Sequence, residues 1–278
     1  MRKQLKSLVA RFNWRRRSIV RKLPAHKLKL EHDMNSNPCG LCGSSTNWVK
    51  VFNYPSADVD YAEIYMHLEC GVLQNLSAQS WGLEEKKVQS KWVDEGFYSL
   101  PSDESEFNRE AMHAAGIFPW LEEELGVSLR NSTLLEIGSG SGLRSAGATA
   151  YFNKVYTFDT SAELISQINS RELGKSVTVI SDAELWKFPV DWIVGWHVFE
   201  HLLDPAKVFM SGDKVLNPGG GFFFQVPLLT SKNVFPGHHF FFTEQSLLHF
   251  FSKIGKYEVR FYYDLQVEAL TCLARKCD

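Results

Sequence analysis

The chain has 278 residues, 44% of them hydrophobic, which is enough to bury a full α/β core and leave material for a second, smaller module. No apolar run approaches the roughly 18 residues that a membrane-spanning helix needs. Residues 1–30 hold 11 of the 30 basic residues and no acid, so the rest of the chain carries 19 basic against 32 acidic residues. An acidic body of this kind argues against a nucleic-acid-binding function.

Residues 1–36 are predicted to form a basic amphipathic arm. Apolar residues such as Leu5, Leu8 and Phe12 recur at three- and four-residue steps among the arginines and lysines. Such a segment suits contact with an anionic membrane surface, mitochondrial targeting or nucleic-acid binding, and a partly disordered tail is a further alternative. We favour peripheral membrane contact through residues 1–30.

Residues 37–75 are predicted to form a small zinc-binding knuckle. Cys39 and Cys42 make a C-x-x-C pair, and His67 and Cys70 follow after 24 residues. Together they supply four nitrogen and sulfur ligands, the number that a structural, tetrahedral zinc ion takes. The alternative is a pair of reduced cysteines in a short turn, with His67 merely exposed. Five cysteines do not resemble a secreted disulfide framework, which favours a reducing compartment such as the cytoplasm.

The next segments lead into the larger domain. Residues 76–104 carry aromatic side chains among charges and are expected to be a linker or lid. Residues 106–125 are predicted to be one helix that ends at Gly126.

The most informative stretch is a buried strand at 134–137 that runs into Gly138, Gly140 and Gly142. Glycines let backbone N–H groups approach a ligand closely. A dinucleotide fingerprint would need glycine at Leu143, so a nicotinamide or flavin site is disfavoured. Asp159, 21 residues after Gly138, ends the next predicted strand and is placed to accept hydrogen bonds from both hydroxyls of a ribose.

The remaining elements complete an alternating α/β pattern. Strands are predicted at 154–159, 177–180, 190–196 and 222–226, a helix at 243–254, and a closing hairpin from 257–264 and 268–275. The phenylalanine runs at 222–224 and 240–242 are interpreted as core packing.

This series closely resembles the class I S-adenosylmethionine-dependent methyltransferases over about residues 105–278. The resemblance rests on the E-x-G-x-G-x-G loop at 136–142, the acid after the second strand, V-x-E-H-x-x-D-P at 198–205 and L-x-P-G-G at 216–220. It implies a Rossmann-like, seven-stranded domain that binds S-adenosylmethionine. The knuckle resembles the zinc-binding domain ahead of bacterial methyltransferases that act on activated sugars and surface glycans, although His67 stands where cysteine is commoner.

The resemblance also assigns site residues. The methionine part of the cofactor would be contacted by Glu136, Gly138, Gly140 and Gly142 of the glycine-rich loop. Asp159 would bind the ribose, and Asp182 would lie near the adenine. The catalytic candidates are histidines after the fourth and fifth strands: His197, His201, His238 and His239. A histidine has a pKa suited to a base, but the Glu200-His201 pair often stabilises its loop instead. The di-acid metal site of some quinone O-methyltransferases is incomplete, because His197 stands where their first glutamate lies.

The sequence therefore predicts methyl transfer from S-adenosylmethionine to a small polar acceptor, a sugar or glycan intermediate. The alternatives are a quinone or lipid-precursor O-methyltransferase and a non-catalytic, cofactor-binding scaffold. The [DN]-P-P-[YFW] motif of enzymes that methylate nucleobase amines is absent after strand four, so nucleic acid is not the expected acceptor. The expected location is the cytoplasm, peripherally at a membrane, with the mitochondrion as the alternative.

Overall fold

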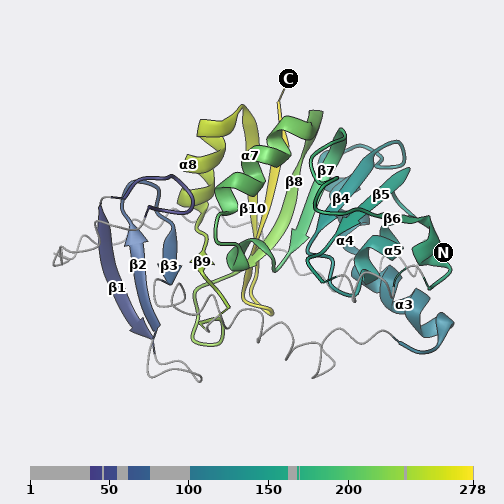
Figure 1. Cartoon of the computed structure of the whole chain (residues 1–278), viewed down its shortest axis with the longest axis horizontal. Helices are drawn as coiled ribbons and strands as arrows, with labels where there is room; N and C mark the ends of the chain where they lie inside the picture. The colour runs from purple at the N-terminus through teal and green to yellow at the C-terminus, as the bar shows by residue number, and fades with distance from the viewer. Residues whose placement is uncertain are drawn as a thin grey trace.

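Seven strands form the central sheet of the protein, in the order β10-β11-β8-β7-β4-β5-β6 (Figure 1). The computed structural model describes residues 38–45, 47–54, 62–75, 101–161, 168, 170–234 and 237–277. The predicted basic arm and almost all of the predicted lid at 76–104 lie outside these residues. No helix within the described residues is long and apolar enough to cross a membrane.

The sheet is parallel except at one edge. The parallel strands are β4 (Thr133–Ile137), β5 (Lys154–Phe158), β6 (Val177–Val179), β7 (Val190–Trp196) and β8 (Leu216–Pro227). The hairpin of β10 (Tyr257–Asp264) and β11 (Ala269–Lys276) adds to β8 in the antiparallel sense. The Rossmann-like, seven-stranded class I methyltransferase fold is thereby confirmed.

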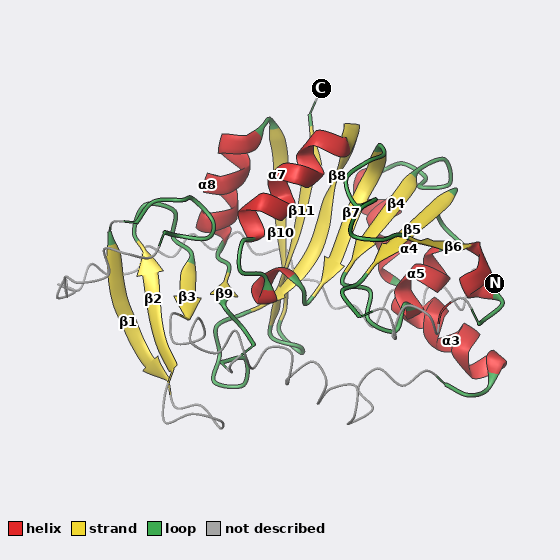
Figure 2. Cartoon of the chain, in the orientation of Figure 1, coloured by secondary structure: helices red, strands yellow, loops and turns green. Residues whose placement is uncertain are grey.

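Helices cover both faces of the sheet (Figure 2). On one face, α7 (Pro205–Val215) and α8 (Glu244–Ile254) share a core with Phe222 and Phe224 of β8. On the other face, α4 (Ile117–Leu125) packs with Phe223 of the same strand. All three phenylalanines are fully buried, because a parallel sheet covered on both sides needs apolar residues at consecutive positions.

The predicted single helix at 106–125 is in fact two helices, α3 (Glu104–Ala114) and α4. Pro119 explains the break, since a proline in the interior of one long helix would lose a backbone hydrogen bond and clash with the carbonyl of Ala115. In the first turn of α4 the same proline is tolerated. The predicted end at Gly126 is confirmed, and this residue caps α4 in the left-handed conformation with φ 68°. The short helix α5 (Leu143–Ala148) follows β4.

A second, four-stranded sheet joins the N-terminal module to the larger domain. Its order is β1-β2-β3-β9, with β1 (Trp48–Tyr54), β2 (Ala62–His67) and β3 (Leu73–Asn75) from the module and β9 (Phe240–Phe241) from the C-terminal half. Figure 1 shows β9 between these three strands and the central sheet. Residues of both parts, including Trp48 and Phe240, belong to one hydrophobic core. The two parts are thus packed together through a shared sheet and a shared core.

Candidate active site and metal centre

The glycine-rich loop lies at the carboxyl end of β4. The strand order reverses here, because β5 and β6 lie on one side of β4 and β7 and β8 lie on the other. Ligands of open α/β sheets bind at this switch point. Gly138, Gly140 and Gly142 all have positive φ, at 65°, 54° and 75°. Side chains other than glycine rarely adopt this conformation, so the glycines are what allow the chain to turn here. The turn leads directly into α5.

Asp159 follows β5 and closes this loop from the neighbouring strand. Its Oδ2 accepts a hydrogen bond of 2.8 Å from the Gly140 N–H, and its Oδ1 accepts one of 2.9 Å from the Ser161 N–H. The buried hydroxyl of Ser139 has no hydrogen-bond partner among the described residues. A ligand that contacts both the loop and Asp159 would supply the missing partner. The loop and the acid therefore fit the cofactor that the sequence predicts.

Glu136 is 1% exposed and is held from the side of α5. Its Oε1 lies 3.2 Å from Arg144 Nη1, and its other oxygen accepts a hydrogen bond from Ser145. Burial raises the pKa of Glu136, and Arg144 opposes this shift. The Arg144 guanidinium also stacks on Trp196 at the end of β7, 4.7 Å from its ring centroid. Glu136 thus anchors the start of α5 to the sheet, while its predicted contact with the methionine part stays a prediction.

Asp182 lies on the turn after β6 and is exposed. It is therefore at the correct edge of the sheet for the predicted adenine contact, two strands away from β4.

Glu200 is the centre of a cluster of three histidines. It is fully buried on the short 3-10 helix η3 (Phe199–His201). Its Oε1 lies 3.3 Å from His197 Nδ1, 3.9 Å from His201 Nε2 and 3.8 Å from His238 Nε2. Burial would raise the pKa of Glu200, but the three imidazoles outweigh it and lower the pKa below the usual value. The carboxylate is therefore charged at neutral pH.

His197 has a strained backbone. Its φ is 55°, a conformation that few residues other than glycine adopt, and strain of this kind is concentrated at functional sites. Its Nε2 lies 3.2 Å from Gln225 Oε1, and its side chain is 41% exposed, more than those of His201 and His238. His197 is thus the most accessible imidazole beside Glu200.

His201 and His238 are each fixed by a backbone carbonyl. The Nδ1–H of His201 donates to the Gly237 carbonyl at 2.7 Å, and that of His238 donates to the Asn233 carbonyl at 2.6 Å. Burial and the nearby His201 lower the pKa of His238 to about 3. His238 is therefore neutral near pH 7 and is a poor general base there.

His239 does not join this cluster, although the sequence places it beside His238. Its ring is 2% exposed, and neither ring nitrogen has a hydrogen-bond partner among the described residues. Burial lowers the pKa of His239 to about 4. Its backbone N–H donates to the Glu200 carbonyl at 2.8 Å, and its carbonyl accepts from the Asn75 N–H of β3 at 2.9 Å. Its observed contacts are those of a residue that supports the loop.

The glycine-rich loop and the histidine cluster are in contact. A Cβ added to Gly138 would lie 2.4 Å from Cγ2 of Val198, the residue between His197 and η3. The cofactor loop and the candidate catalytic groups therefore adjoin at the carboxyl edge of β4 and β7.

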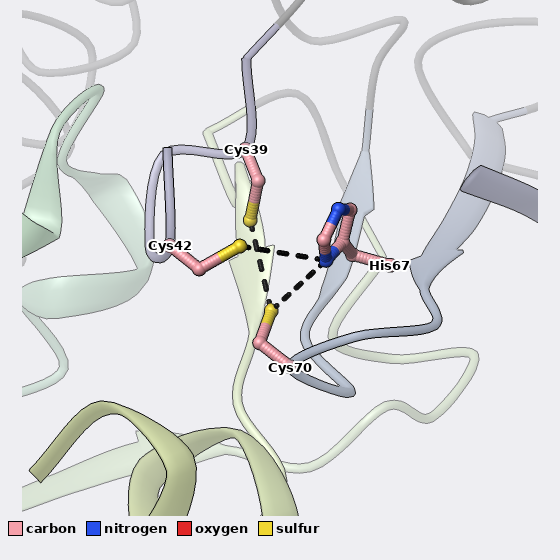
Figure 3. Close-up of side chains that lie close together, drawn as sticks. All are labelled: Cys39, Cys42, His67 and Cys70. Atoms are coloured by element: carbon pink, nitrogen blue, oxygen red, sulfur yellow. Dashed lines mark hydrogen bonds between the residues drawn. The ribbon is translucent and has the colours of Figure 1, made fainter. Parts of the chain in front are cut away.

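The predicted metal ligands Cys39, Cys42, His67 and Cys70 converge on one point (Figure 3). Cys39 Sγ lies 3.7 Å from Cys70 Sγ, and His67 Nδ1 lies 3.5 Å from Cys42 Sγ and 3.4 Å from Cys70 Sγ. A tetrahedral zinc ion with bonds of about 2.3 Å to sulfur and about 2.0 Å to nitrogen needs sulfur–sulfur separations of about 3.8 Å and sulfur–nitrogen separations of about 3.5 Å. The arrangement fits a Cys₃His zinc module.

The geometry rules out a disulfide and contradicts one part of the alternative for these four residues. A disulfide would need sulfur atoms about 2.05 Å apart, and all the cysteines are free. A hydrogen bond from Cys70 lowers the pKa of the Cys39 thiol below its usual value. His67 is fully buried, which contradicts the alternative in which it is merely exposed.

Direct contacts tie the knuckle to the candidate active site. Thr243, the N-cap of α8, donates its hydroxyl to the Gly71 carbonyl at 3.0 Å. Leu73 and Gln74 of β3 pair with Phe241 and Phe240 of β9, directly after the His238-His239 loop. A metal ion in the knuckle would therefore support the loop that carries His238.

Arg144 was not predicted from the sequence, and Glu200 was named only as the loop-stabilising neighbour of His201 and not as the centre of a cluster. Arg144 has no motif of its own, and only its contact with Glu136 reveals its role. For Glu200 a signal existed, since the spacing in His197-x-x-Glu200-His201 brings three ionisable groups into one turn.

A family model described as a methyltransferase domain matches residues 109–256. No curated protein matches the sequence. Among solved structures, magnesium protoporphyrin IX methyltransferase from Synechocystis PCC 6803 with bound SAH is 14% identical, with a TM-score of 0.51 over 69% of this chain and 99% of that chain. The CurJ carbon methyltransferase is 16% identical, with a TM-score of 0.47 over 60% of this chain and 54% of that chain. At 14% identity, the likeness to the Synechocystis protein shows the fold alone.

Proposed function

The chain belongs to the methyltransferase-domain family and is an S-adenosylmethionine-dependent methyltransferase, and we propose that its acceptor is a sugar or glycan intermediate that offers a hydroxyl group. The observation that carries the proposal is the strained His197 beside the buried Glu200, directly next to the cofactor loop. Bound S-adenosylmethionine supplies an electrophilic methyl group. The protein must then orient the acceptor and remove its proton.

On the cofactor side, the backbone N–H groups of the glycine-rich loop hold the methionine part, and Asp159 binds the ribose. Asp159 already accepts a hydrogen bond from Gly140, so the two ends of the site are fixed relative to each other before a ligand binds. Asp182, on the turn after β6, contacts the adenine.

On the acceptor side, His197 takes the proton of the hydroxyl. Its Nδ1 faces Glu200, whose carboxylate orients the ring and stabilises the imidazolium that forms. Its Nε2 lies 3.2 Å from Gln225 Oε1, and it takes the proton of an acceptor hydroxyl that replaces this contact. His201 and His238 face the same Glu200 carboxylate, while His239 acts through the loop.

We also propose that the knuckle holds one structural zinc ion and that the protein works in the cytoplasm. The four convergent ligands leave no position open, which is typical of structural zinc. Reduced thiols are required to bind it, which suits a reducing compartment. Peripheral membrane contact through residues 1–30 belongs to the same proposal, because lipid-linked glycans would be met at a membrane surface.

Two measurements test this function in the full-length protein. Calorimetric titration with S-adenosylhomocysteine should give micromolar binding, which Asp159→Ala weakens at least tenfold and Glu123→Ala, an exposed control on α4, leaves unchanged. Methyl transfer is then screened with sugar acceptors and with quinone precursors, using wild type and His197→Gln. We expect turnover with a sugar, and a lower kcat with a similar KM for His197→Gln. Turnover only with a quinone precursor would replace the proposed acceptor, and cofactor binding without any turnover would favour a scaffold.

A further inference from the structure

We propose that Glu200, His201 and His238 form a second metal site, which binds a divalent transition-metal ion at the acceptor side of the active site. The three ligand atoms lie within 4.8 Å of one another. They come from η3 and from the loop before β9, so the chain brings together residues that are 37 positions apart. The metal's role rests on the proposed function, but its binding does not.

The first argument is the orientation of the two imidazoles. Each donates its Nδ1–H to a backbone carbonyl, His201 to Gly237 and His238 to Asn233. Each Nε2 is therefore directed toward the Glu200 carboxylate, at 3.9 and 3.8 Å. Histidines that bind metals almost always donate their other ring N–H in this way, because the contact fixes the tautomer and the ring orientation.

The second argument is the state of Glu200. The residue is fully buried, and among the described residues neither of its carboxylate oxygens has a hydrogen-bond partner. A buried carboxylate without hydrogen bonds is costly, and a cation bound between it and the two imidazoles would remove that cost. Of the three nearby imidazoles, His197 comes within 3.3 Å of Oε1, whereas His201 and His238 lie at 3.9 and 3.8 Å and leave most of the carboxylate lone pairs without a donor.

The separations are slightly wider than a bound ion requires. Ligand bonds of about 2.1 Å at tetrahedral angles place neighbouring donor atoms about 3.4 Å apart. The observed 3.8 and 3.9 Å therefore need a contraction of about half an ångström. Small rotations of the His201 and His238 rings about their carbonyl contacts can provide it.

The donor set indicates which metal would bind. Two imidazoles and one carboxylate suit Fe²⁺, Mn²⁺, Co²⁺ or Zn²⁺, whereas Mg²⁺ and Ca²⁺ prefer oxygen ligands alone. Three protein ligands leave positions open, unlike the four-ligand knuckle. A hydroxyl of the acceptor in an open position would be polarised by the ion and would release its proton more easily to His197.

The knuckle would help to hold this second site. The loop that carries His238 is fixed on one side by the hydrogen bond from Asn75 of β3 to the His239 carbonyl and on the other by the bond from His239 to the Glu200 carbonyl. A zinc ion in the knuckle would thus position the second metal's ligands without touching them.

The test is a titration of the full-length protein with Mn²⁺, because manganese prefers carboxylate and imidazole ligands and does not displace zinc from thiolates. The knuckle stays loaded with zinc, and binding is followed by calorimetry and by the electron paramagnetic resonance signal of free Mn²⁺. We expect one Mn²⁺ per chain. Glu200→Gln and His238→Gln should weaken it at least tenfold, while Glu123→Gln and His113→Gln, exposed controls on α4 and α3, should not.

Two further measurements keep the result decisive. Near-ultraviolet circular dichroism reports whether each variant is folded. His201→Gln, at a partly exposed position, is the third ligand variant and is measured so that the result does not depend on a variant that fails to fold. Titration with S-adenosylhomocysteine is run on the same samples. If wild type binds S-adenosylhomocysteine but not Mn²⁺, the metal site is refuted and the proposed function stands. If it binds Mn²⁺ with unchanged affinity in all three ligand variants, the site is elsewhere and the proposal is also refuted.

Discussion

Substitution of Gly138 by alanine tests whether the glycine-rich loop and the histidine segment really pack against each other. The residue has φ 65°, and a Cβ at this position would lie 2.4 Å from Val198 Cγ2 and 2.9 Å from Val198 Cγ1. The left-handed conformation costs alanine about 1 kcal/mol. Forcing an extra methyl against a stiff, β-branched side chain adds about 1–3 kcal/mol. We therefore expect Gly138→Ala to lower the free energy of unfolding by about 2–4 kcal/mol.

Gly126 provides a matched control for the backbone part of this cost. It has a similar φ of 68°, but a Cβ there would meet nothing within 4 Å. Gly126→Ala should therefore cost only about 1 kcal/mol. In a Val198→Ala background the contact is removed, so the additional cost of Gly138→Ala should fall to about 1 kcal/mol, and the coupling between the two positions should be about 1–3 kcal/mol.

The assay is urea denaturation of the four variants and wild type, with S-adenosylhomocysteine binding measured in parallel. Relief of the clash must move either the loop or the Val198 segment, so Gly138→Ala should weaken binding at least tenfold, which is about 1.4 kcal/mol. Gly126→Ala should bind like wild type. Equal stability losses in Gly138→Ala and Gly126→Ala, or no coupling with Val198→Ala, would refute the packing between the two segments.

Three further predictions concern the knuckle, a buried histidine and the thiols. Removal of zinc by chelation, or Cys42→Ser, should lower the melting temperature by several degrees and increase hydrogen exchange in β3 and β9; an unchanged exchange pattern would contradict the coupling through the shared sheet. Since burial lowers the folded-state pKa of His239 to about 4 while the unfolded value is about 6.5, the unfolded chain binds a proton first. The contribution of the neutral His239 to stability is therefore complete above about pH 6.5 and is lost as the pH falls toward 4. Urea denaturation across this range should show that the free energy of unfolding depends less on pH in His239→Leu than in wild type. An equal pH dependence in the two proteins would argue against a neutral His239. Burial raises the pKa of Cys272 well above its usual value, whereas Cys277 is exposed; a short iodoacetamide pulse followed by mass spectrometry should label Cys277 and spare Cys272, and rapid labelling of Cys272 would contradict its burial in β11.

Features set by residues near one another in the chain could be predicted from the sequence. The strand before Gly138 and the position of Asp159 followed from local apolar runs and from the repeat of the α/β pattern. The knuckle followed from ligand spacing alone, because two residues between donors bring their side chains to one side of a tight turn. The predicted helix at 106–125 was wrong for a local reason, since the effect of Pro119 inside it was not taken into account.

Features that depend on distant segments needed the tertiary structure. Nothing in the spacing of His238 and His239 indicates that one ring faces Glu200 while the other is buried without a hydrogen-bond partner among the described residues. Nor does the sequence indicate that β9 pairs with β3 and so joins the knuckle to the active-site loop. By itself, the sequence determined the fold, the glycine-rich turn and the convergence of the four knuckle side chains, because these follow from backbone conformation and short-range spacing. The environment of Glu200 was decided only when packing of the sheet and its loops placed three histidines around one buried charge.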